Sequence, residues 1–164
     1  MPVLCPFTTK TLEEAQVGEL LAFTRPMGGE FAIKIRQVDF SCMLAVLKSD
    51  GAAQHIASVG RDAECISYGS EWLFEIEQHE AFEVDYDDQE RAGVACVSGA
   101  SIRMRFGRDP NNHQVRGGLL DLETLQFVQQ HGFSFYTRAW KLWVNARERD
   151  RINGRPLVVG TLEQ

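Results

Sequence analysis

Hydrophobic and polar residues alternate along several stretches of this chain, and the longest such stretch runs from residue 72 to 86. Its apolar members are Trp72, Phe74, Ile76, Phe82, Val84 and Tyr86, and its acidic or histidine members are Glu75, Glu77, His79, Glu83 and Asp85. Because successive side chains of a strand point to opposite faces, this period of two predicts an apolar face and an acidic face. The polar residues 78–80 mark either a hairpin turn or a bend in one strand.

Three further strands are predicted near the start of the chain, at 19–24, 30–39 and 42–48. In the second of them, Phe31, Ile33 and Ile35 alternate with Ala32, Lys34 and Arg36, which is typical of a half-buried strand. Turns rich in glycine, proline and serine separate the three strands and favour an antiparallel meander. Residues 49–70 are less regular, and we expect them to form a loop over the sheet.

Residues 102–106 predict a basic strand, because Ile102, Met104 and Phe106 alternate with Arg103 and Arg105. Like charges on one face of a strand lie about 7 Å apart, and a neighbouring strand of opposite charge relieves their repulsion. We therefore expect this strand to lie beside the acidic one. A loop is predicted directly after it, at 107–113.

Two short helices are predicted. Thr11 and Glu14 have the spacing of a capping box, which predicts a helix over 12–16, and Asp121 is a plausible N-cap for a helix over 122–131. Residues 133–152 fit either strand or helix spacing, and we favour a strand that passes into a charged hairpin or short helix.

These elements predict a single domain over residues 1–164, of the β-rich α+β class. The expected architecture is an antiparallel sheet or small open β-barrel of about seven to nine strands, closed by a strand at 157–159, with two short helices. An apolar content of 44% with 24% charged residues is that of an ordinary globular protein.

Charge is divided unevenly along the chain. Residues 1–91 contain 17 acidic and 7 basic side chains, whereas residues 92–164 contain 6 acidic and 10 basic ones. A pI near 5.2 argues against a dedicated nucleic-acid binder. The longest clean apolar run has six residues, too few to cross a bilayer, and Met1–Pro6 lacks the pattern of a secretory signal. We therefore expect a cytoplasmic protein that does not contact a membrane.

Candidate catalytic and metal-binding residues are few and scattered. The four cysteines Cys5, Cys42, Cys65 and Cys96 are widely spaced, which is typical of reduced, buried thiols, although Cys65 or Cys96 could serve as a nucleophile with a distant histidine. His79 is the histidine nearest to carboxylates. Asp85, Asp87, Asp88 and Glu90 could hold a hard cation, but strand geometry would divide them between two faces, so we favour a solvated strand end and no metal. No nucleotide-binding loop is present, and no cofactor is expected.

Basic and aromatic residues interleave at one place only. Arg147, Arg149, Arg151 and Arg155 follow Trp140 and Trp143, and such a set can hold an anion or stack a base. Glu148 and Asp150 offset that charge. The leading hypothesis is therefore a non-enzymatic binding or assembly module that holds a protein partner or a second copy of itself through a sheet face or this Arg/Trp segment. The alternatives are a small hydrolase or transferase with a site near His79, Cys96 and the carboxylates of residues 85–90, and an anion or nucleic-acid binder through the segment Arg147–Arg155.

Overall fold

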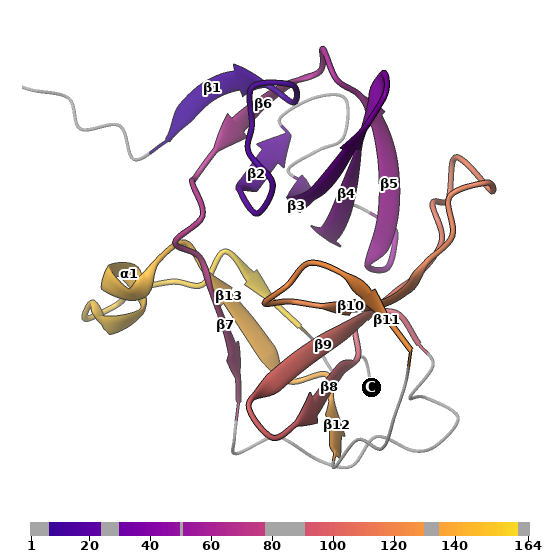
Figure 1. The fold of residues 1–164 in the computed structure, drawn as a ribbon. Helices are drawn as coiled ribbons and strands as arrows, with labels where there is room; N and C mark the ends of the chain where they lie inside the picture. Colours follow the sequence, from indigo (N-terminus) through magenta and orange to yellow (C-terminus); the bar gives the residue numbers. More distant parts are fainter. Residues whose placement is uncertain (1–6, 24–29, 50, 78–90, 130–134, 161–164) are drawn as a thin grey trace, which may run out of the picture.

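The computed structural model of the chain describes residues 7–23, 30–49, 51–77, 91–129 and 135–160 (Figure 1). These residues form fourteen strands in three antiparallel sheets and one helix of five residues. The predicted β-rich, antiparallel architecture is confirmed. The expected seven to nine strands and two helices are wrong for the described part of the chain, which has more strands, in several sheets, and a single helix.

The first sheet has six strands in the order β1-β6-β2-β3-β4-β5. Its members are β1 (Thr8–Thr11), β2 (Leu20–Phe23), β3 (Glu30–Val38), β4 (Ser41–Lys48), β5 (His55–Gly60) and β6 (Glu64–Ser67). The predicted meander is confirmed, since β2, β3, β4 and β5 are neighbours in chain order. The loop expected at 49–70 is wrong. Buried Ile56 and Ala57 hold β5 against β4. Strand β6 lies between β1 and β2, and the hydrophobic periodicity of the sequence does not reveal this non-local pairing.

The remaining strands form two smaller sheets below the first one in Figure 1. One has the order β11-β10-β9-β8-β12, with β8 (Ala95–Ser98), β9 (Ser101–Phe106), β10 (Gly118–Asp121), β11 (Phe127–Val128) and β12 (Phe135–Thr137). The other has the order β14-β13-β7, with β7 (Leu73–Ile76), β13 (Trp140–Trp143) and β14 (Val158–Val159). β14 agrees with the closing strand predicted at 157–159.

The largest apolar core contains residues of all three sheets. Ile33 and Leu47 come from the first sheet, Met104 from the second and Trp140 from the third. The Trp140 indole stacks on the Phe74 ring, with 5.0 Å between the ring centroids. A backbone link also joins the first sheet to the second, because the Ile56 N–H donates to the Gly107 carbonyl at 3.0 Å and the Gly107 N–H donates to the Gln54 carbonyl at 2.8 Å. The surfaces between the sheets are therefore fixed by packing and by hydrogen bonds.

The predicted pairing of acidic and basic strands is wrong in the described part of the chain. β7 pairs with β13, where Glu75 lies opposite Lys141, and both edges of β9 are occupied by β8 and β10. Arg103 lies 3.6 Å from Asp121 on β10. Hairpins between strands adjacent in sequence close shorter loops, which favours β8 and β10 as partners of β9. Residues 78–86 of the expected acidic strand lie outside the described residues.

Neither predicted helix forms as expected. The Glu14 carboxylate accepts the Thr11 N–H at 2.8 Å, as a capping box requires, but the segment closes as a turn because Leu12 and Ala15 are drawn into the core of the first sheet. Asp121 likewise accepts the backbone N–H groups of Glu123 and Thr124, yet the chain turns back into β11 at Leu125, whose φ is +56°.

The helix that does form, α1 (Ala146–Asp150), follows β12 and β13. The favoured interpretation of residues 133–152 is one strand that passes into a charged hairpin or short helix. A short helix does follow, but the described positions before it form two strands in different sheets, β12 and β13. Asn145 caps α1 by accepting the Glu148 N–H at 2.9 Å. No helix in the described ranges has the length and apolar character that a bilayer crossing needs.

Candidate binding groove

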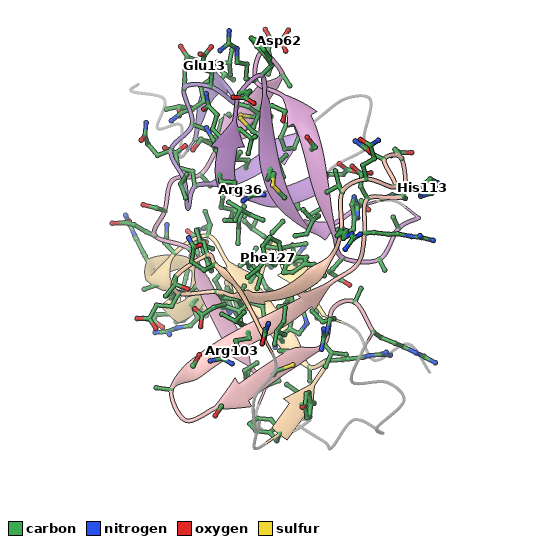
Figure 2. All side chains as sticks on the ribbon, turned by 45° about the vertical axis from the view of Figure 1, so that its right-hand side comes forward. Glu13, Arg36, Asp62, Arg103, His113 and Phe127 are labelled. Carbon is green, nitrogen blue, oxygen red and sulfur yellow. The ribbon has the colours of Figure 1, made fainter. Side chains whose placement is uncertain are left out.

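A groove of about 450 Å³ lies between the first sheet and the second. We call it the β3–β5 groove. Its upper wall is formed by Arg36, Val38, Ser41, Met43 and Ser58 of β3, β4 and β5. Its lower wall is formed by Gln114, Val115, Arg116 and Gly117, which precede β10, and by Phe127 of β11. Figure 2 shows Arg36 above Phe127, at the place where the two parts of the molecule meet.

A β-bulge in β3 directs Arg36 into this groove. Lys34 pairs with Leu44 and Arg36 pairs with Met43, so Ile35 is an extra residue between two consecutive positions of β4. An extra residue reverses the alternation of faces beyond it. Lys34 therefore shares a face with the buried Leu44, whereas Arg36 shares the opposite face with Met43. The strict alternation expected for residues 31–36 is wrong at this point.

The groove combines positive charge with apolar surface. Val38 and Phe127 are 41% and 40% exposed, and both line the groove. Arg36 donates from Nε to the Met43 sulfur at 2.8 Å. Among the residues that the structure describes, no carboxylate lies within ion-pair distance of Arg36 or Arg116, and none lines the groove. A guanidinium beside apolar surface suits a carboxylate attached to an apolar group.

The lower wall is held in place by Asp109. This carboxylate is only 5% exposed, and it accepts the Asn111 N–H at 2.8 Å and the Ser58 N–H of β5 at 3.4 Å. The Asp109 N–H donates to the Val115 carbonyl at 3.2 Å. At Gly117 a Cβ would lie 2.2 Å from the Phe106 carbonyl oxygen, so only glycine allows this close approach. These contacts fix the backbone on both sides of Arg116.

The opposite face of the first sheet is closed. Lys34 is 2% exposed, and its ammonium donates to the carbonyls of Leu12 at 2.6 Å and Ala15 at 2.7 Å and to the Gln37 side-chain oxygen at 3.2 Å. The two bonds to backbone carbonyls fix the turn after β1 against β3. All three N–H donors of the Lys34 ammonium are therefore satisfied by acceptors inside the protein.

Glu19 and Cys65 lie near this closed face. Burial raises the pKa of the Glu19 carboxyl, but hydrogen bonds from Ser67 at 2.6 Å and from Lys10 at 3.0 Å outweigh that effect and hold the pKa below its usual value. Burial raises the pKa of the Cys65 thiol to about 11. This thiol is therefore protonated at neutral pH and is a weak nucleophile.

The structure separates the predicted binding residues into two groups. The exposed group is Arg147, Arg149, Arg151 and Arg155. Trp140 is fully buried and donates from Nε1 to the Gly93 carbonyl at 2.9 Å, and Trp143 is 8% exposed and donates to Glu75 at 2.7 Å. The six residues thus do not form one surface.

Two of the exposed arginines pair within their own segment. Arg149 lies 2.8 Å from Asp150, and Arg151 lies 3.6 Å from Glu148. The hydrogen bond from Arg149 lowers the pKa of the Asp150 carboxyl. The offset of charge expected from Glu148 and Asp150 therefore occurs for these two arginines.

Of the predicted catalytic and metal-binding residues, only the cysteines Cys65 and Cys96 lie in the described part of the chain. Cys96 is fully buried beside Val94 and Leu119. His79, Asp85, Asp87, Asp88 and Glu90 lie outside the described residues. Within the ranges that the structure describes, no three histidine, cysteine or acidic side chains are grouped as a metal site would require.

Sequence reasoning missed the groove residues Arg116 and Phe127 and treated Arg36 only as the polar side of a strand. The one usable signal was Phe127, the only aromatic residue of the sequence between Phe106 and Phe133. The bulge at Ile35 and the return of β11 are set by tertiary pairing, which sequence spacing does not reveal. Comparison with known proteins finds no family model, curated protein or solved structure that matches this chain.

Proposed function

We propose that the protein is a non-enzymatic binding module whose β3–β5 groove holds a protein partner. The observation that supports this proposal is the pair Arg36 and Arg116, which face half-exposed Val38 and Phe127 and have no carboxylate within ion-pair distance among the described residues. Exposed apolar side chains next to unneutralised arginines are typical of protein-binding surfaces, where arginine and aromatic residues are enriched.

The chemistry of the groove favours one class of partner. A volume of about 450 Å³ is small, so the groove accepts a short segment and not a whole domain face. The apolar part formed by Val38, Met43 and Phe127 favours an apolar side chain, and the two guanidinium groups favour a neighbouring carboxylate. The expected partner presents an extended segment that carries an aromatic or aliphatic residue beside aspartate, glutamate or a C-terminal carboxylate.

Selection from a random peptide library tests this proposal. We expect enriched peptides to contain an acidic group next to an apolar residue and to bind in the micromolar range, as short segments commonly do. Fluorescence anisotropy with one enriched peptide measures the affinity. The double variant Arg36→Gln/Arg116→Gln should weaken binding at least about tenfold, because each charge-assisted hydrogen bond contributes about 1.5–3 kcal/mol.

A matched control is the double variant Arg149→Gln/Arg151→Gln, which removes two exposed arginines outside the groove. It should leave the affinity unchanged. Peptides that are basic, or that bind equally well to both double variants, would refute the groove as the site. Loss of binding in the control variant alone would instead favour the alternative in which the Arg147–Arg155 segment binds anions.

A further inference from the structure

Among the residues that the structure describes, Met43 is the one sulfur-containing residue that is not buried. Cys42, Cys96 and Met104 are fully buried and Cys65 is 5% exposed, whereas Met43 is half-buried and lines the β3–β5 groove. Burial also raises the pKa of the Cys65 thiol to about 11, so this cysteine lacks the thiolate that reacts with oxidants. A dissolved oxidant therefore meets the Met43 side chain before it meets the others of this set.

Strand register places Met43 directly beside Arg36. The two residues are opposite each other on β4 and β3, and Ser58 of β5 lies opposite Met43 on its other side, so the three form one row across the sheet. Side chains in such opposite positions have Cβ atoms about 4.5–5.5 Å apart. The Arg36 Nε–H accordingly donates to the Met43 sulfur at 2.8 Å. Because a thioether is only a weak acceptor, this contact leaves the guanidinium available to another molecule.

Oxidation of the Met43 thioether replaces this weak acceptor with a strong one. A lone pair of the sulfur attacks one oxygen of hydrogen peroxide, the O–O bond breaks, and the second oxygen leaves as water with both protons. The methionine loses two electrons and becomes a sulfoxide, and the peroxide gains them. The new oxygen is bonded to the atom that Arg36 already contacts, so it lies within reach of the same guanidinium.

We infer that Met43 is a redox-sensitive modification site that controls the β3–β5 groove. After oxidation by a peroxide, the sulfoxide oxygen accepts hydrogen bonds from Arg36 and holds its guanidinium against β4, and the apolar part of the groove becomes polar. Both changes weaken the binding of an acidic, apolar segment, and reduction by methionine sulfoxide reductases restores it. The effect on binding rests on the proposed function, whereas the oxidation and the new hydrogen bond do not.

Two measurements that need no binding partner test the modification itself. After treatment with hydrogen peroxide, peptide mapping by mass spectrometry should show that Met43 is oxidised at least about tenfold faster than the fully buried Met104. In the ¹H–¹⁵N spectrum, the Arg36 Nε–H signal, identified by its loss in Arg36→Gln, should shift and should exchange more slowly with solvent after oxidation. Equal oxidation rates of the two methionines, or an unchanged Arg36 signal, would overturn the inference.

Fluorescence anisotropy tests the consequence for binding, with the peptide selected from the library as the probe. Oxidation should weaken its affinity for the wild type at least about fivefold, and treatment with the two reductases, one for each sulfoxide epimer, should restore it. Met43→Leu, which keeps every other methionine, is the matched control, and its affinity should be the same before and after peroxide treatment.

The outcomes separate this inference from the proposed function. A wild-type affinity that oxidation leaves unchanged, or a loss of the same size in Met43→Leu, would overturn the role of Met43. Failure to select any peptide would instead refute the proposed function, and the oxidation rates and the Arg36 signal would still decide whether Met43 is the modification site.

Discussion

Lys34 and Arg36 are two cations of strand β3, and one is buried whereas the other is exposed. Lys34 lies on the closed face of the first sheet, where three oxygen atoms of the protein accept its hydrogen bonds. Arg36 lies two residues further on, on the open face, and is exposed in a groove with Val38 and Phe127. The bulge at Ile35 causes this difference, because it places the two side chains on opposite faces of β3.

The difference shows that the role of a charged side chain depends on its hydrogen-bond and ion-pair partners inside the protein, and not on its charge alone. Lys34 stabilises the fold, since its ammonium joins the turn after β1 to β3. Arg149 and Arg151 are exposed, but Asp150 and Glu148 already pair with them. Arg36 combines exposure with an apolar neighbourhood and no described carboxylate partner, which makes it suited to bind another molecule.

The largest expected effect is the difference in stability between variants of Lys34 and of Arg36. Lys34→Met should lower the free energy of unfolding by about 3 kcal/mol, because it removes the donor from three acceptors, two of them backbone carbonyls. Arg36→Met should change it by less than about 0.5 kcal/mol, as is usual for exposed positions. Urea denaturation of both variants measures the difference. Equal stabilities would contradict the assignment of the two side chains to a closed and an open face.

A smaller effect is expected at Asp109, which links the lower wall of the groove to β5. Asp109→Ala should lower the free energy of unfolding by about 1.5 kcal/mol, because the Ser58 and Asn111 N–H groups lose their acceptor. It should also weaken peptide binding, since Arg116 is no longer held in place. Asp109→Asn retains an acceptor oxygen and serves as the control. Normal peptide affinity in Asp109→Ala would show that the groove does not need this anchor.

The smallest expected effect concerns the closed face and depends on pH. The pKa of Glu19 is lower in the folded protein than its ordinary value of 4.5, so its contribution to stability is complete above that value and is lost as the pH falls through the folded-state pKa. Glu19→Gln should therefore be less stable than the wild type at pH 7, and the difference should shrink as the pH falls below the ordinary value of 4.5. A difference that grows on acidification would show that the sign of the shift is wrong.

Much of the fold could be predicted because it depends on local patterns. The alternation in residues 30–39 and the turn residues around it predict β3 and its meander neighbours. The order of strands could not be predicted where partners are distant in sequence, as for β6 between β1 and β2 and for β7 beside β13. Local rules also failed where burial overrode them, as at the turn that contains Leu12.

The candidate site could be predicted only in general terms. A sheet face that holds a partner was expected, but its residues depend on the one-residue bulge at Ile35 and on the return of the chain at Leu125, where φ is positive. Neither position carries a glycine, which is the usual sign of such backbone geometry. The Arg/Trp segment drew attention because its residues are close in sequence, whereas Arg36 and Arg116 are far apart in sequence.

The most direct test of the β3–β5 groove is a ¹H–¹⁵N NMR titration of the wild-type protein with a peptide selected from the library. Binding in the groove predicts that the largest chemical-shift changes fall on Met43, Ser58, Val115 and Phe127, which line it from both walls. Changes centred on residues 146–155 or on residues 51–54, with the groove signals unmoved, would contradict the account.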